Sequence, residues 1–285
     1  MTQEVKATPT VDLYYATDPL CSFCWAFEPT LLKFRYQYKS YLADDTILMG
    51  GMIPSWDTFG GDQGNGIQKA TDVTHHWQEI GKYTRMPIDG TIWSEKPIDS
   101  SYPSSRVFEI VRRDFPEIAN QTLRQIREAI MLRNQDISEK SVLKSVLEKV
   151  GLDSEHILEE AEGAAGQELL TKDLQMVQAL QASGFPTVVL VNNQNQGLKV
   201  VGAQPFEALV SALEQILPSG TDLVPEAVPS LAEVVKTHTT MLSKEIEVLY
   251  DIEKEMVLEF VASQLPAEQF ETETILNETY YTFIK

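Results

Sequence analysis

Two cysteines separated by two residues stand where a short β-strand is expected to turn into an α-helix. Cys21 and Cys24 flank Ser22 and Phe23, and they are the only cysteines among the 285 residues. A single pair at this spacing excludes a structural disulfide framework of the kind that holds small secreted domains together. The pair is therefore either a chemical site or an accident, and the surrounding pattern has to distinguish the two.

The residues on both sides of the pair predict a β-α-β unit. Residues 11–17 are β-branched and aromatic, which is typical of a strand, and Asp18-Pro19 ends that strand because proline cannot donate to a ladder. Residues 24–42 carry apolar side chains at helical spacing, with Pro29 near the start of the predicted helix. Residues 46–50 form a short apolar run suited to a buried strand, parallel to the first.

Two thiols on the first turn of a helix suit thiol–disulfide exchange. The positive end of the helix dipole lowers the pKa of an outer thiol, so Cys21 is the expected nucleophile and Cys24 the resolving thiol. Neither Ser22 nor Phe23 is basic, so we expect no strong extra stabilisation of the thiolate. In a reducing compartment the pair would rest as a dithiol, which favours reductase or isomerase work.

Two other interpretations of the cysteines stay open. Free cysteines often serve as small buried apolar residues, although the strand–turn–helix context disfavours that here. A zinc site needs about four ligands, whereas His75 and His76 are adjacent rather than at ligand spacing. We expect no metal.

The rest of the chain predicts an α/β protein with a thioredoxin fold, a large all-helical insertion and a C-terminal extension. Helical periodicity covers residues 104–114, 121–133, 138–150 and 154–180 after a glycine-rich loop at 60–66. A hairpin of residues 187–191 and 198–201 and a helix running from Pro205 to Ile216 complete the second half. We expect the first half of the thioredoxin fold at residues 1–60, the insertion at 61–180 and the second half at 181–218. A linker at 219–230 then leads to the C-terminal extension at 231–285. Within this extension we expect two or three helices followed by a hairpin of residues 272–276 and 279–284.

Phe185-Pro186 precedes the second predicted hairpin. In this fold we expect the peptide to be cis and to face the dithiol, which leaves the Phe185 backbone free to pair with an extended substrate. That prediction depends on the fold assignment, because cis proline has a low base rate.

The charge balance limits the partners. The chain carries 42 acidic against 23 basic residues, a formal charge of −19, which repels nucleic acid and anionic membranes. Residues 1–18 have no apolar signal segment, and no later run reaches the length of a membrane span, so we expect a cytoplasmic protein. We expect protein or peptide thiols and disulfides as substrates, and no cofactor beyond the dithiol itself. Glutathione and thioredoxin are the candidate electron donors. A homodimer stays open as an alternative to a monomer.

The segment from Asp18 to Trp25, the helical insertion and Gly184-Phe185-Pro186-Thr187 resemble the DsbA family, particularly its cytosolic FrnE-like dithiol–disulfide isomerases. The resemblance covers residues 11–217. It implies Cys21 as nucleophile, Cys24 as resolving thiol and Pro186 as the cis proline. It also suggests a peptide groove, for which the candidate residues are Ser22, Phe23, Trp25, Trp56 and Phe185, although the aromatic ones would equally suit a core.

The chain departs from this family at one notable position. Many relatives carry a buried acid six residues before the first cysteine, where this chain has Tyr15. Asp18 is the candidate substitute for proton transfer to Cys24, and capping the helix is its alternative role.

Two other families remain as alternatives. Residues 18–29 and the end of the chain, 280–285, also resemble the thioredoxin-fold adaptors that deliver a transcription regulator to the ClpXP protease. Those proteins use the fold as a docking surface. Glutathione transferases of kappa type share the insertion but commonly have serine where Cys21 stands.

Overall fold

The structure is a computed structural model that describes residues 10–284. Residues 1–9 and Lys285 lie outside the described part, so the first predicted unit, 1–60, is described from residue 10 onward. Half of residues 1–18, on which the expectation of no N-terminal signal depends, therefore also lies outside it.

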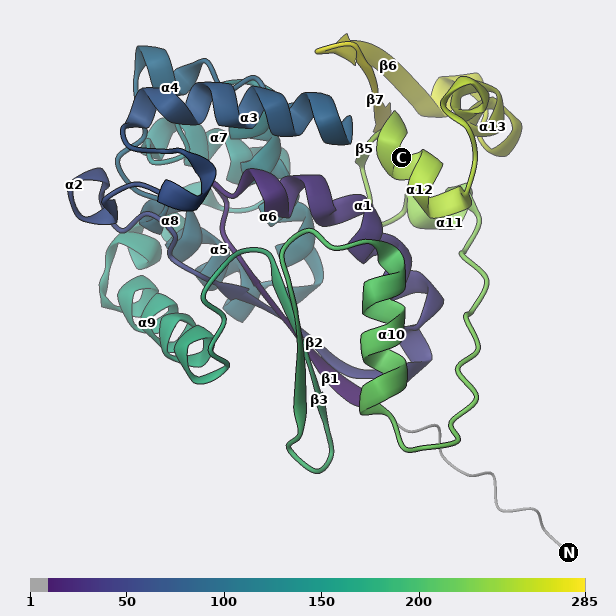
Figure 1. The fold of residues 1–285 in the computed structure, drawn as a ribbon. Helices are drawn as coiled ribbons and strands as arrows, with labels where there is room; N and C mark the ends of the chain where they lie inside the picture. Colours follow the sequence, from purple (N-terminus) through teal and green to yellow (C-terminus); the bar gives the residue numbers. More distant parts are fainter. Residues whose placement is uncertain (1–9, 285) are drawn as a thin grey trace, which may run out of the picture.

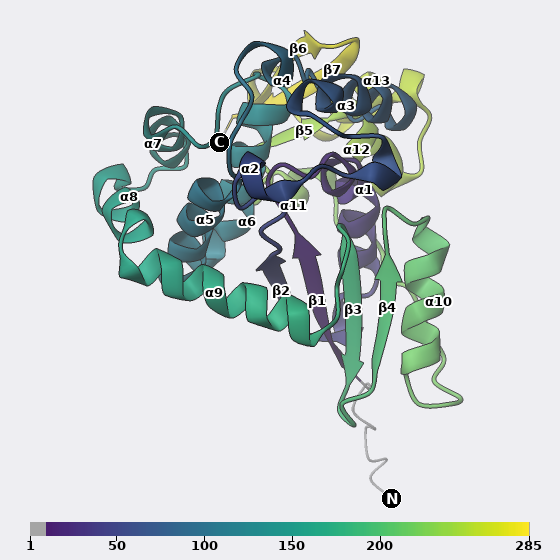
Figure 2. The same cartoon turned by 60° about the vertical axis from the view of Figure 1, so that its left-hand side comes forward.

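A four-stranded mixed sheet forms the first core, with the strand order β2-β1-β3-β4 (Figure 2). β1 (Val11–Thr17) pairs in parallel with β2 (Leu42–Met49) and antiparallel with β3 (Thr187–Asn192). β3 in turn pairs antiparallel with β4 (Gly197–Val201). This arrangement confirms the predicted thioredoxin fold, in which two halves separated by more than a hundred residues share one sheet.

Alternate residues of β1 face opposite sides of this sheet. Val11, Leu13 and Tyr15 belong to the large core, whereas Tyr14 and Ala16 pack in a smaller cluster with Val177 and Ala182 at the end of the insertion. Figures 1 and 2 show α10 (Phe206–Ile216) beside β3 and β4 and α9 (Ala164–Ala179) crossing near β2. Apolar side chains on both faces explain why β1 reads as a nearly continuous apolar run.

The helix after β1 ends earlier than predicted. α1 spans Ser22–Gln37 and a 3₁₀ turn follows at Lys39–Tyr41, whereas the apolar spacing predicted a helix to residue 42. Leu42 instead opens β2 and lies opposite Val11. An apolar residue at this spacing fits either element, and the sheet pairing decides between them.

The insertion is helical, with more helices than predicted. Its elements are α2 (Trp56–Phe59), α3 (Ala70–Thr84), α4 (Ile92–Glu95), α5 (Tyr102–Asp114), α6 (Pro116–Met131), α7 (Lys140–Lys149), α8 (Ser154–Glu162) and α9. The prediction of one helix over 154–180 is wrong, because the chain breaks at Gly163. Any side chain at Gly166 would meet the backbone of Ala161, so glycine permits the tight crossing between α8 and α9.

The segment predicted as a linker lacks helix and strand but is held against the first core. The Tyr41 hydroxyl donates to the Asp222 carbonyl at 3.2 Å, and the Glu226 amide donates to the Gln37 carbonyl at 2.7 Å. It leads to α11 (Leu231–Val234), β5 (Thr240–Leu242), α12 (Ser243–Tyr250), α13 (Val257–Gln264), β6 (Phe270–Ile275) and β7 (Glu278–Phe283). The predicted hairpin is present as β6 and β7, and the missed strand β5 extends it to a sheet of order β5-β7-β6.

We call residues 231–284 the C-terminal module. It has an apolar core of its own and packs against the thioredoxin-fold part through α12 and α1 (Figure 1). Arg124 of α6 pairs with Glu245 at 2.6 Å, and Arg85 after α3 pairs with Glu247 at 2.7 Å and Glu278 at 2.9 Å. These carboxylates are buried, so the ion pairs fix the position of the module.

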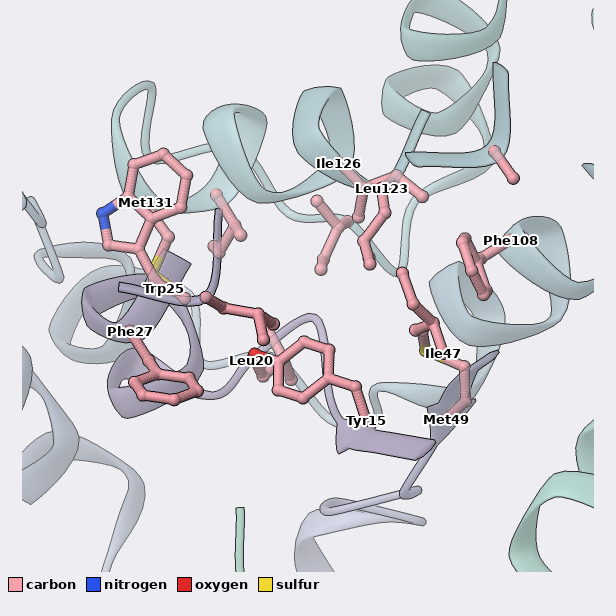
Figure 3. Packing of buried hydrophobic residues seen from close by; sticks show 14 of the residues in the cluster. Tyr15, Leu20, Trp25, Phe27, Ile47, Met49, Phe108, Leu123, Ile126 and Met131 are labelled. Atoms are coloured by element: carbon pink, nitrogen blue, oxygen red, sulfur yellow. The ribbon is translucent and has the colours of Figure 1, made fainter. Parts of the chain in front are cut away.

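The large core runs from the sheet into the insertion. Figure 3 shows Tyr15, Leu20 and Trp25 among its buried side chains, together with Phe108 and Ile126 from the insertion. Within residues 10–284, no helix combines the length and the apolar character needed to cross a membrane.

Candidate functional site

The two cysteines form a disulfide at the amino-terminal end of α1. Their Cα atoms are 5.2 Å apart. Cys21 has extended backbone angles and is the capping residue of α1, and the Cys24 amide donates to Cys21 Sγ at 3.1 Å. An N–H group and the positive end of a helix therefore both point at the Cys21 sulfur, an arrangement that favours a thiolate.

A cavity of about 560 Å³ opens beside the disulfide. Cys21 lines it and is 4% exposed, whereas Cys24 is fully buried and does not line it. The remaining walls come from residues 50–53 after β2, residues 59–67, α3, and residues 183–185 before β3. The cavity has the size of a small-molecule or peptide side-chain site, and it reaches only one of the two sulfurs.

Phe185 forms part of the cavity wall. The Phe185–Pro186 peptide is cis, as predicted, and β3 begins at the following residue, Thr187. The Phe185 ring lies against Gly50, where any side chain would overlap it. The close approach of an aromatic ring thus requires glycine at the end of β2.

Asp18 does not cap α1, which was one of the two roles predicted for it. Its carboxylate accepts hydrogen bonds from the Leu20 amide at 2.9 Å, the Met52 amide at 2.7 Å and the Ser101 hydroxyl at 2.8 Å, and the cap of α1 is the Cys21 sulfur. Burial raises the pKa of Asp18, while these donors and Arg127 oppose the rise. Asp18 therefore ties the turn before the dithiol to two loops, and proton transfer to Cys24 stays a prediction for this residue.

Neither Trp25 nor Trp56, two of the residues predicted to bind a peptide, lines the cavity beside Cys21. Trp25 is fully buried, its indole N–H donates to the Pro87 carbonyl at 3.1 Å, and Arg124 lies over its ring. Trp56 packs on Phe59 and Trp93 behind the cavity wall and is not part of the lining. Trp25 thus belongs to the buried core and Trp56 packs partly buried against it, whereas Ser22 and Phe23 line the cavity.

The site contains residues that the sequence did not indicate. His76 of α3 places Nε2 3.5 Å from Ser22 Oγ and meets the Phe23 ring edge-on, with centroids 5.5 Å apart. Burial lowers the pKa of His76, while Asp62 and Glu79 oppose this. The missed helix α3 carries this side chain, and the spacing of Val73, Trp77 and Gly81 on its buried face was the signal that could have predicted the helix.

Tyr15, six residues before Cys21, is buried beside the dithiol. Its hydroxyl reaches the Cys24 carbonyl at 3.5 Å, and burial raises its pKa, so the phenol keeps its proton at neutral pH. Beside it the buried Arg127 donates to Thr17 Oγ1 at 2.5 Å and pairs with Glu28 of α1. The interior near Cys24 thus holds a neutral phenol and the Arg127–Glu28 ion pair.

Histidine, cysteine and acidic side chains do not gather in groups of three or more that could hold a metal ion anywhere in residues 10–284.

Comparison with known proteins gives two kinds of match. The pattern of the family described as thioredoxin matches residues 14–211. The chain is 30% identical to the ClpXP adapter protein SpxH of Halalkalibacterium halodurans, over 88% of this chain and 81% of that protein. It is 25% identical to the ClpXP adapter protein SpxH of Bacillus subtilis, over 87% of this chain and 80% of that protein.

A solved structure is similar over a shorter part. The cytosolic disulfide reductase DsbM of Pseudomonas aeruginosa superimposes with a TM-score of 0.55 and 20% identity, covering 70% of this chain and 97% of that chain. Nearly all of that chain is therefore matched while almost a third of this one is not. This likeness concerns the fold.

Proposed function

Because the chain belongs to the thioredoxin family and is similar to SpxH adapters along most of its length, we propose that the protein is an adapter for the ClpXP protease. In this proposal the protein binds a regulator in the cytoplasm and delivers it to the protease. A second activity, thiol–disulfide exchange, is proposed below for the dithiol.

One observation carries the adapter proposal. The match to SpxH covers 88% of the chain, which is more than residues 1–230 comprise, so it includes part of the C-terminal module. The match to the disulfide reductase covers only 70%. Ion pairs from Arg85 and Arg124 hold the C-terminal module on the thioredoxin fold. A module that is shared in part with adapters and held in place by ion pairs supports a role in binding a protein.

Protein turnover in cells tests this proposal. We expect at least one protein to have a severalfold longer half-life when the gene for this chain is deleted, but only if ClpX is present. Restoring either the wild-type chain or the Cys21→Ala/Cys24→Ala variant should restore turnover, because docking does not need the sulfurs. The absence of any half-life that depends on both ClpX and this chain would contradict the adapter proposal.

The geometry of the dithiol favours thiol–disulfide exchange as a second function. Of the two cysteines, only Cys21 lines the cavity, and it lies at a helix end that stabilises its thiolate. Cys24 is buried directly behind it. Cys21 attacks a substrate disulfide, and Cys24 then resolves the mixed disulfide. The cytoplasm keeps thiols reduced, so we propose that the protein reduces or isomerises disulfides there.

Trapping tests the exchange activity. Cys24→Ser leaves Cys21 without its resolving thiol, so mixed disulfides with substrates should accumulate and appear as reducible bands on non-reducing gels. Cys21→Ser is the matched control, because it removes the nucleophile and leaves a thiol that does not line the cavity. Equal trapping by the two variants, or none by Cys24→Ser, would show that Cys21 is not the exchanging sulfur.

A further inference from the structure

Within residues 10–284, the side chains that line the cavity beside the dithiol include an acidic group but no basic lysine or arginine. Among the described residues that line it, one carboxylate, Asp62, and one imidazole, His76, are titratable side chains other than the cysteines, and none is lysine or arginine. Asp62 lies in the loop at residues 59–67, where its carboxylate caps a short 3₁₀ turn by accepting from the Asn65 amide at 3.2 Å. A ligand approaching Cys21 therefore meets a negative group without a fixed positive one.

The imidazole does not compensate for this charge near neutral pH. Burial lowers the pKa of His76, against the opposing effect of Asp62 and of Glu79 on the same helix, so His76 is mainly neutral. Its neighbour His75 pairs with Glu79 at 3.3 Å, outside the cavity lining. The net charge of −19 adds a weaker field of the same sign over the whole surface.

We propose that this cavity selects disulfides by charge, so that Cys21 reacts fastest with cationic disulfides and slowest with anionic ones. The inference rests on the proposed exchange activity and specifies its substrate class as disulfides carried by amines or by lysine- and arginine-bearing peptides. Glutathione, which is a net anion, is then a poor partner for this site, in contrast to the expectation from the sequence that it could serve as an electron donor.

The chemical step begins from the reduced protein. The Cys21 thiolate attacks one sulfur of the substrate, which forms a mixed disulfide and releases the other half as a thiolate that takes up a proton. Cys24 loses its proton and attacks Cys21 Sγ, which forms the Cys21–Cys24 disulfide and releases the second half as a thiol. The dithiol thus transfers two electrons to the substrate, and selection by charge acts on the first attack.

Single-turnover rates with three small disulfides of similar shape test the proposal. The probes are cystamine, which is cationic, 2-hydroxyethyl disulfide, which is neutral, and dithiodiglycolate, which is anionic. Each rate with reduced wild-type protein is divided by the rate with an uncharged small thiol, which removes the intrinsic reactivity of the probe. At low salt we expect the order cationic, neutral, anionic, with about three- to tenfold between successive probes, and we expect added salt to narrow this range.

Matched variants locate the charge. Asp62→Asn should narrow the spread of the normalised rates, whereas Asp57→Asn, at an exposed acid outside the lining, should leave it unchanged. Gln63→Lys adds a positive charge to the lining without removing the cap at Asp62, and it should speed up the anionic probe severalfold.

The outcomes separate this inference from the function on which it rests. If none of the three probes oxidises the dithiol, the exchange activity itself is wrong. If they react but with equal normalised rates, or with the anionic probe fastest, exchange stands and charge selection is overturned. Equal effects of Asp62→Asn and Asp57→Asn would also overturn it, because the selection would then come from the surface as a whole.

Discussion

Gly50 determines how close the Phe185 ring can approach the end of β2. A Cβ added at Gly50 would overlap the Phe185 ring, whereas a Cβ added at Gly51 or Gly61, which also line the cavity, would first meet other residues. Gly50 does not have a positive φ, so alanine is disfavoured there only by the ring.

Gly50→Ala should therefore displace Phe185 and change the cavity. We expect a loss of about 1–3 kcal/mol in the free energy of unfolding, typical of overpacking, and a slower reaction of reduced Cys21 with 2-hydroxyethyl disulfide. Urea unfolding and stopped-flow oxidation measure the two effects.

Gly184→Ala is the matched control for this variant. Gly184 lines the same cavity, has no positive φ, and, apart from the residues adjacent in the chain, the nearest atom to an added Cβ would be Val201 Cγ1 at 4.0 Å. It should change stability by less than about 0.5 kcal/mol. Similar losses in the two variants would show that contact with Phe185 is not what requires glycine at position 50.

The sequence predicted those site residues whose role follows from the residues adjacent to them in the chain. Cys21 and Cys24 share one helical turn, so a short pattern was sufficient for them, whereas the cis peptide at Pro186 was predicted from the fold assignment. His76, Asp62 and Gly50 reach the cavity only through tertiary packing, and no local pattern indicates that. Trp25 shows the opposite error, because an aromatic residue next to the dithiol suggested a groove whereas α6 buries it.

Among the helices and strands, a buried cluster of charges joins α5, α9 and β2. Arg112 pairs with Glu109 and, at 2.8 Å, with Asp173, and Asp173 accepts from the Met49 amide at 2.7 Å. Burial, followed by the charge of Asp173, raises the pKa of Glu109 to about 9. Glu109 is therefore protonated in the folded protein at neutral pH.

This raised pKa makes stability depend on pH. Between 4.5, the ordinary value, and about 9, the folded state binds more protons at Glu109 than the unfolded state does. The contribution of Glu109 is thus complete below pH 4.5 and is lost as the pH rises through 9. We expect Glu109→Gln to reduce the decline in the free energy of unfolding between pH 6 and pH 9, as measured by urea unfolding.

Glu168→Gln serves as the control for that measurement. Glu168 is an exposed acid paired with Lys172 one turn away on α9, and its pKa is lowered rather than raised. Its replacement should leave the decline between pH 6 and pH 9 unchanged. A decline that is equally steep in Glu109→Gln and in the wild type would contradict the assignment of a proton to Glu109.

The bounds of helices and strands were predicted correctly where the local sequence and the tertiary contacts favour the same element. β1 and β3 have the predicted starts because β-branched runs end at turns or at proline. The end of α1 and the break at Gly163 were missed, because the first depends on sheet pairing at Leu42 and the second on the crossing of α8 and α9. β5 has only three residues, and pairing with β7 defines it.

In the whole molecule, the thioredoxin fold and the C-terminal module form one body. Glu28 of the dithiol helix and Glu245 of α12 both bind Arg124, and Arg124 also lies over the Trp25 ring next to Cys24. The sequence treated the C-terminal module as an appendage after a linker, because ion pairs between distant segments leave no local pattern. The structure instead makes it a fixed part of the surface that the adapter proposal assigns to protein binding.

Degradation by purified ClpXP tests the central claim most directly, with a client protein identified from the turnover experiment. We predict that adding this chain increases the rate of client degradation severalfold, and that the Cys21→Ala/Cys24→Ala variant does so equally well. Degradation at the same rate with and without the wild-type chain, despite active ClpXP and ATP, would contradict the account.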